Sequence, residues 1–84
     1  MGQDKKITAA VLSGMQDRNI GFTDLYNLLV GLGFSVRIKG DHHIFTRPDV
    51  VEIINLQPDG DKAKPYQVRQ VRSLIVKYKL GGEL

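Results

Sequence analysis

Two stretches in the first part of the chain carry apolar side chains at the three- and four-residue spacing of an amphipathic helix. The first predicts a helix over residues 6–17, with an apolar stripe formed by Ile7, Ala10, Val11 and Met15. The second predicts another helix, with a stripe formed by Leu25, Leu28, Leu29 and Leu32. Thr23 is placed to cap the start of this second helix, and Gly33 is placed to end it, because helices often end at a glycine in the left-handed conformation.

The spacing of apolar residues then changes to two, which is typical of strands with one buried face. Strands are predicted at residues 34–39, 42–46 and 50–56. Gly40 and Asp41 predict a tight turn between the first two strands, and residues 47–49 contain a proline and predict the next turn. The three strands are therefore expected to form an antiparallel meander.

The last part of the chain returns to helical spacing. Residues 57–64 are rich in turn-forming residues and predict a loop, and Pro65 suits the first turn of a helix. This helix is expected to run to about Lys79, with an apolar stripe formed by Val68, Val71, Leu74, Ile75 and Tyr78. The glycines at positions 81 and 82 are expected to fray.

This order, α-α-β-β-β-α, indicates an α+β fold in which the helices pack on one face of a three-stranded antiparallel sheet. The expected core includes Leu28, Leu29, Phe34, Val36, Ile38, Val71 and Ile75. With 84 residues, the chain is expected to be a single domain over residues 1–84.

Composition narrows the class of protein. The chain is 42% apolar and 25% charged, which is ordinary for a globular protein. It has no cysteine, so it forms no disulfide and has no thiolate metal site or cysteine nucleophile. It also lacks an apolar run long enough to span a bilayer and an apolar stretch near its start that would suit a signal peptide. We therefore expect a soluble, cytoplasmic protein that makes no contact with a membrane.

The positive charge is concentrated near the C-terminus. The chain has a formal net charge of +3, but residues 61–80 alone carry +5 and the rest carries −2. The cations of this segment are Lys62, Lys64, Arg69, Arg72, Lys77 and Lys79. Such asymmetry suits a polyanion such as nucleic acid, or an acidic protein partner. A solvated helix face is the alternative interpretation.

The adjacent residues His42 and His43 are the candidates for chemistry, because the side chain of histidine titrates near neutral pH. On a regular strand they point to opposite faces, so they cannot jointly bind a metal ion, and no other pattern of metal ligands is present. Serine-nucleophile, dinucleotide-binding and phosphate-loop motifs are also missing. We therefore predict neither a metal nor a cofactor.

A histidine at a tight turn beside a basic helix suits the cleavage of RNA. RNA supplies its own nucleophile, the 2′-hydroxyl, so a protein needs only to move protons and stabilise the charge on the phosphorane. A histidine with nearby lysine or arginine could do this without metal. The alternative is that His42 has only a structural or surface role.

The sequence Gly-Asp-His-His-Ile-Phe at residues 40–45 has Leu-Gly-Phe at 32–34 before it and Pro-Asp at 48–49 after it. This arrangement resembles the HicA family of type II toxin–antitoxin modules, over about residues 23–80. The resemblance implies a fold like that of the double-stranded RNA-binding domain, with a HicA-like core at 21–80 and an N-terminal helical extension at 1–20. It also implies an mRNA interferase, a metal-independent endoribonuclease that a HicB-like antitoxin neutralises.

The resemblance assigns roles to individual residues. The catalytic histidine of the family corresponds to His42, and the glycine of its motif corresponds to Gly40. His43 is its neighbour on the opposite face, with a contact to RNA or a supporting role. In the RNA-binding fold, phosphates meet the last helix and the loop before it, which here carry Lys62, Lys64, Arg69 and Arg72.

Two other functions remain open alongside the mRNA interferase. A module of the same fold could bind RNA without cutting it, or the basic helix could serve only to hold an acidic antitoxin. Asp41 also departs from the family pattern, which usually has serine there. A carboxylate at this position could favour the imidazolium form of His42 or repel RNA.

Overall fold

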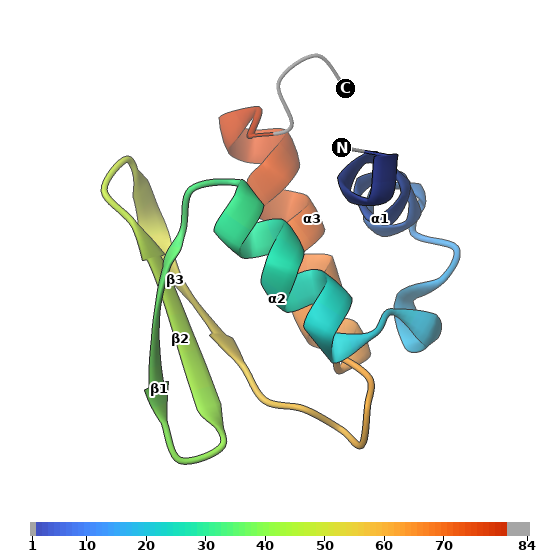
Figure 1. The fold of residues 1–84 in the computed structure, drawn as a ribbon. Coiled ribbons are helices and arrows are strands. Elements are labelled where there is room, and N and C mark those ends of the chain that lie inside the picture. Colours follow the sequence, from blue (N-terminus) through green and yellow to red (C-terminus); the bar gives the residue numbers. More distant parts are fainter. Residues whose placement is uncertain (1, 81–84) are drawn as a thin grey trace.

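The computed structural model describes residues 2–80, with side chains from residue 5 onward (Figure 1). Its elements are α1 (Gly2–Ser13), the 3-10 helix η1 (Asp17–Asn19), α2 (Phe22–Gly31), β1 (Ser35–Lys39), β2 (His42–Arg47), β3 (Val50–Leu56) and α3 (Pro65–Tyr78). The three strands form one antiparallel sheet in the order β1-β2-β3. The predicted α+β fold is therefore confirmed. The glycines at 81 and 82 lie outside the described residues.

The elements form three layers. Figure 1 shows the sheet on one side, α2 and α3 packed together beside it, and α1 on the far side of these two helices. The helices therefore cover one face of the sheet, as predicted, although α1 packs on other helices and not on the strands. The face of the sheet turned away from the helices, here called the open face, carries Ser35, Arg37, Lys39, His42, Ile44, Thr46, Val51, Ile53 and Asn55.

The core lies between the sheet and the pair α2 and α3. Phe45 of β2 is at its centre, paired with Val36 of β1 and Ile54 of β3 and completely buried. Burial in β3 alternates residue by residue, which follows from the two-residue period of a strand. The other buried apolar residues are Val11, Ile20, Leu25, Leu28, Leu29, Phe34, Val50, Leu56, Ala63, Val68, Val71, Leu74 and Ile75.

Two of the residues assigned to the core differ from the prediction. Ile38 is 58% exposed, and Val36 is only partly buried. Ile38 pairs with His43 on the helix-facing side of the sheet, but the β1–β2 turn extends past the ends of the helices (Figure 1). A side chain this close to the turn has the orientation of a core residue without a helix to cover it.

The turn between β1 and β2 depends on Gly40. Lys39 and His42 are paired, so Gly40 and Asp41 form a two-residue hairpin turn. Gly40 has a φ of 60°, whereas Asp41 is not among the positive-φ residues, a pattern that suits a type II′ turn with glycine in its first central position. The predicted turn is confirmed, and it brings His42 to the start of β2.

The predicted helix over residues 6–17 has its ends in the wrong places. In the structure α1 begins at Gly2 and ends at Ser13, and Gly14 follows it with a φ of 72°. A left-handed glycine ends helices readily, because it has no Cβ to clash with the backbone. Met15, expected on the apolar stripe, lies beyond the helix end and is 86% exposed.

The start of α2 also differs from the prediction. Thr23 is not the capping residue: the helix begins at Phe22, Gly21 occupies the N-cap, and no side chain caps it. The backbone N–H of Phe22 donates instead to the carbonyl of Asp61, at 2.9 Å. At the other end, Gly33 has a φ of 94° just after the helix, as predicted.

An ion pair between α3 and β3 stabilises the edge of the sheet. Nζ of Lys77 donates to Glu52 at 2.7 Å, and the hydroxyl of Tyr78 donates to Glu52 at 2.6 Å. These hydrogen bonds, the one from Lys77 first, lower the pKa of Glu52 from 4.5 to about 2.

We expect the Glu52→Gln variant to lose less stability on acidification than the wild type. Because the pKa of Glu52 is lower in the folded state, its carboxylate stabilises the fold above pH 4.5, and this contribution is lost as the pH falls from 4.5 to about 2. The variant should be less stable than the wild type at pH 7, with a smaller difference at low pH. Urea unfolding across this range measures both effects, and a constant difference between the two proteins would contradict the assignment.

Candidate nucleic-acid interface

His42 is the first residue of β2, and its side chain lies on the open face. Its Nδ1 atom is 3.2 Å from Oδ1 of Asn55 on β3. An amide oxygen only accepts hydrogen bonds, so this contact favours the tautomer of His42 with its proton on Nδ1. The other nitrogen, Nε2, then has a free lone pair, which is what a general base needs.

Asn55 is held in place from the helix-facing side. It is the cross-strand partner of Ile44, and its backbone carbonyl accepts a hydrogen bond from Nε2 of Gln67 at 3.3 Å. Gln67 is only 1% exposed, and its Oε1 atom accepts a bond from the backbone N–H of Lys64 at 3.4 Å. The first turn of α3 is therefore tied to the strand that orients His42.

His43 points to the opposite face of the sheet, as predicted. It packs edge-on against two rings of α2, with centroids 4.9 Å from Phe22 and 5.8 Å from Tyr26. Its Nδ1 atom is 3.1 Å from the carbonyl oxygen of Asp41. These contacts give His43 a packing role beside α2, and they keep the two histidines from acting on one substrate atom together.

The loop with Lys62 and Lys64 lies at the same end of the sheet as the histidines. Lys62 forms a β-bridge with Gly21, the residue before Phe22, whose ring contacts His43. Nζ of Lys64 donates to Oε1 of Gln57 at 3.3 Å, just after the end of β3. The loop with these two predicted RNA-binding lysines therefore lies at the end of the sheet where β2 begins with His42 and His43.

The other two cations predicted to bind RNA lie elsewhere. Arg72 forms a bidentate ion pair with Asp17 of η1, with N–O distances of 2.8 and 3.1 Å. It also donates a hydrogen bond to the backbone carbonyl of Val11 at 3.0 Å. The hydrogen bonds from Arg72, with a smaller effect from the charge of Arg69, lower the pKa of Asp17. Arg69 and Arg72 therefore lie beside the N-terminal segment, and the guanidinium of Arg72 serves to hold that segment on α3.

Asn55 and Gln67 were not predicted as site residues. Asn55 interrupts a strand of β-branched and apolar residues, and asparagine is depleted in strands, so its presence at residue 55 was a usable signal. Gln67 had no such signal, because its burial and its bond to Asn55 depend on how α3 crosses β3.

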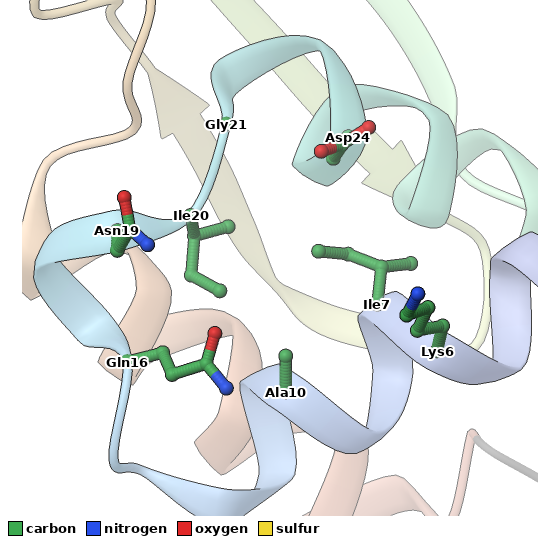
Figure 2. Close-up of a pocket in the computed structure, with 8 residues that line it drawn as sticks. All are labelled: Lys6, Ile7, Ala10, Gln16, Asn19, Ile20, Gly21 and Asp24. Atoms are coloured by element: carbon green, nitrogen blue, oxygen red, sulfur yellow. The ribbon is translucent and has the colours of Figure 1, made fainter.

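The molecule also has a hollow of about 380 Å³ between α1, η1 and the start of α2. In Figure 2 the apolar side chains of Ile7, Ala10 and Ile20 lie around it, with polar side chains such as Gln16 and Asp24 nearby. This hollow is on the α1 side of α2, whereas His42 is on the open face of the sheet. The two therefore do not form one site.

The described residues show neither a metal cluster nor a membrane span. Over residues 2–80, no three side chains of the metal-binding types gather at one place. Within the same part of the chain, no helix combines the length and the apolar character needed to cross a membrane.

Comparison with known proteins gives one finding. A family model described as the HicA toxin of bacterial toxin-antitoxin matches residues 22–77, which is 56 of the 84 residues. The matched segment begins with α2, contains the whole sheet with His42, and ends within α3. Comparisons with curated proteins and with solved structures give no match.

Proposed function

The chain belongs to the HicA toxin family of bacterial toxin–antitoxin systems, and we propose that it is a metal-independent endoribonuclease that cleaves mRNA with a single catalytic histidine, His42. Membership in this family implies a cognate antitoxin as partner. The observation that carries the proposal is the contact of 3.2 Å between Nδ1 of His42 and Oδ1 of Asn55, which leaves Nε2 on the open face as a proton acceptor.

The proposed reaction uses the nucleophile that RNA itself carries. Nε2 of His42 takes the proton of a 2′-hydroxyl, and the 2′-oxygen attacks the adjacent phosphorus. A bond forms between the 2′-oxygen and phosphorus, and the bond from phosphorus to the 5′-oxygen breaks. The leaving 5′-oxygen takes up a proton from water, and His42 returns its proton to solvent. The products are a 2′,3′-cyclic phosphate and a 5′-hydroxyl end.

The surroundings of His42 suit a phosphodiester substrate. Lys62 and Lys64 supply positive charge at this end of the sheet, where they would contact phosphates. At Gly40, no atom lies within 4 Å of where a Cβ would be, so the turn leaves room for the RNA backbone to approach. In the proposed function His43 has a supporting role, because its contacts with Phe22 and Tyr26 hold the strand that begins with His42.

The proposed partner is a HicB-like antitoxin that covers His42 and so prevents RNA from reaching it. The exposure of His42 on the open face supports this proposal, because nothing within residues 2–80 shields the side chain from a protein partner. A substrate of mRNA and a partner of this kind support the proposal that the protein works in the cytoplasm.

We expect purified protein to cleave a long single-stranded RNA in the presence of EDTA. The products should end in a 2′,3′-cyclic phosphate, because the 2′-oxygen is the nucleophile. A denaturing gel with end-group analysis measures this, and a DNA of the same sequence is the matched control that should stay intact. Cleavage that requires added Mg²⁺, or that also cuts the DNA, would contradict the mechanism.

A further inference from the structure

The open face carries two cations that neither the turn motif nor the basic C-terminal segment includes. Arg37 and Lys39 are exposed residues of β1, and their side chains point to the same side of the sheet as His42. Within the described part of the chain, neither side chain forms an ion pair or a hydrogen bond. Their charges are therefore free to interact with a ligand.

The acidic residues nearest to this face are turned away from it or lie at its ends. Glu52 of β3 faces α3, where it bonds Lys77 and Tyr78. Asp49 is in the β2–β3 turn, where it forms an ion pair with Arg47 at 2.9 Å. Asp41 lies in the β1–β2 turn, and Asp59 and Asp61 lie in the loop that follows β3. No residue of the open face itself is acidic, so the face has net positive charge.

The two cations form a row that leads to His42. Lys39 is the direct cross-strand partner of His42, so their Cβ atoms lie about 5 Å apart. Arg37 is two residues further along the same strand, which places it about 7 Å from Lys39. Beside Arg37 is a hollow of about 300 Å³, lined by Ser35, Arg37, Ile44 and Thr46 among others.

We propose that the open face is the binding site for single-stranded RNA, with the RNA backbone following β1 and with Arg37 and Lys39 binding phosphates on one side of the bond to be cut. This inference rests on the proposed function and names the part of the surface that holds its substrate. Charge complementarity favours a chain of phosphates as the occupant, because two unpaired cations lie in a row beside His42. The proposed reaction at His42 needs a 2′-hydroxyl, which makes this occupant RNA and not DNA.

The composition of the open face indicates how the RNA is bound. Apart from the imidazole of His42, none of its residues has an aromatic ring, so it lacks the rows of Phe, Tyr or Trp rings on which bases stack in many single-strand binding proteins. The apolar residues Val51 and Ile53 lie at the β3 side, away from the basic row on β1. Binding through Arg37 and Lys39 therefore reads the backbone and tolerates many sequences.

The test compares the wild type with the double variant Arg37→Gln, Lys39→Gln. The probe is a fluorescent 2′-O-methyl RNA of about 20 nucleotides, which cannot be cleaved because its 2′-oxygen is blocked. The matched control is Arg18→Gln, which removes an exposed cation of η1 on another part of the molecule. Fluorescence anisotropy at several salt concentrations gives the affinity and its dependence on salt.

We expect the slope of log affinity against log salt to fall by about 1.4 in the double variant, about 0.7 for each lost phosphate contact. Between about 50 and 200 mM salt, the wild type should therefore lose about sevenfold more affinity than the variant does. The Arg18→Gln control should keep the slope of the wild type. If the double variant keeps this slope as well, the proposed site on β1 is wrong.

Cleavage assays on the same proteins separate this inference from the proposed function. If the wild type cleaves RNA and the double variant binds and cleaves equally well, His42 remains the catalytic residue and the site on β1 is overturned. If the double variant loses affinity but the wild type cuts no RNA, the site on β1 holds and the nuclease function fails. If the wild type does not bind the RNA at all, both proposals fail.

Discussion

Replacement of His42 by alanine is expected to reduce the rate of RNA cleavage by about 10²- to 10⁴-fold, the usual contribution of a general base. The affinity for RNA should change little, because in the proposed complex lysine and arginine side chains bind the phosphates. Gel assays under single-turnover conditions in EDTA measure the rate, and anisotropy with a 2′-O-methyl RNA measures the affinity. Unchanged cleavage by the variant would exclude His42 as the base.

The stability of the His42→Ala variant is the necessary control, because a loss of cleavage could also come from unfolding. Because the side chain of His42 is exposed, its removal should change the free energy of unfolding by no more than about 0.5 kcal/mol. If the wild type cuts RNA, and the folded variant binds RNA but cuts it no faster than buffer alone, then His42 has a catalytic role. If the wild type also binds RNA without cutting it, the protein is an RNA-binding module and the nuclease function is excluded.

A substitution of Asn55 tests the role of His42 in a second way, through the pH dependence of the cleavage rate. The Asn55→Asp variant places a carboxylate next to Nδ1 of His42, which favours the imidazolium form of the ring. A base must be neutral to accept a proton, so the acid limb of the pH–rate profile should move to higher pH. A purely structural role for the contact predicts a lower rate with an unchanged profile.

Replacement of Phe45 by alanine is expected to lower the free energy of unfolding by about 3–5 kcal/mol. Phe45 is completely buried, is paired with Val36 and Ile54, and has its ring 5.4 Å from that of Tyr26. Alanine leaves a cavity that its neighbours, held in the sheet and in α2, cannot fill. A chain of this length has a total stability of roughly 4–13 kcal/mol, so the substitution would remove a large share of it.

Urea unfolding followed by circular dichroism measures this effect. The matched control is Val51→Ala, also in the sheet but 88% exposed, which should change stability by less than about 0.5 kcal/mol. A loss of less than about 1 kcal/mol in Phe45→Ala would contradict the central place of this ring in the core.

The order and types of the elements could be predicted because each depends on a local period. Strands alternate every two residues and helices repeat every 3.6, and both periods were visible without knowledge of the fold. The turn at Gly40 was predictable for a similar reason, since its backbone conformation is a property of two adjacent residues. The opposite orientation of His42 and His43 follows from the same alternation.

The sequence could not show which distant parts of the chain meet. Arg72 was predicted to contact phosphate, which stays a prediction, and the structure adds an ion pair between its guanidinium and Asp17, 55 residues away. The orientation of Ile38 was predicted correctly, yet no helix extends far enough to cover it. The period of a helix or a strand predicts the direction in which a side chain points, but it does not predict which residues that side chain contacts.

The candidate site also combines features that follow from local sequence patterns with features that follow from contacts between distant residues. The fold class, the turn and the choice of His42 could be inferred from the sequence, because these depend on local periods and on a motif of adjacent residues. The contact of Asn55 with His42 and the bond from Gln67 to Asn55 became visible only in the folded chain. The same holds for Arg37 and Lys39, which share the face of His42 and have no side-chain partner among residues 2–80. These relations depend on strand register and helix packing, which bring together residues that are far apart in the chain and carry no local signal.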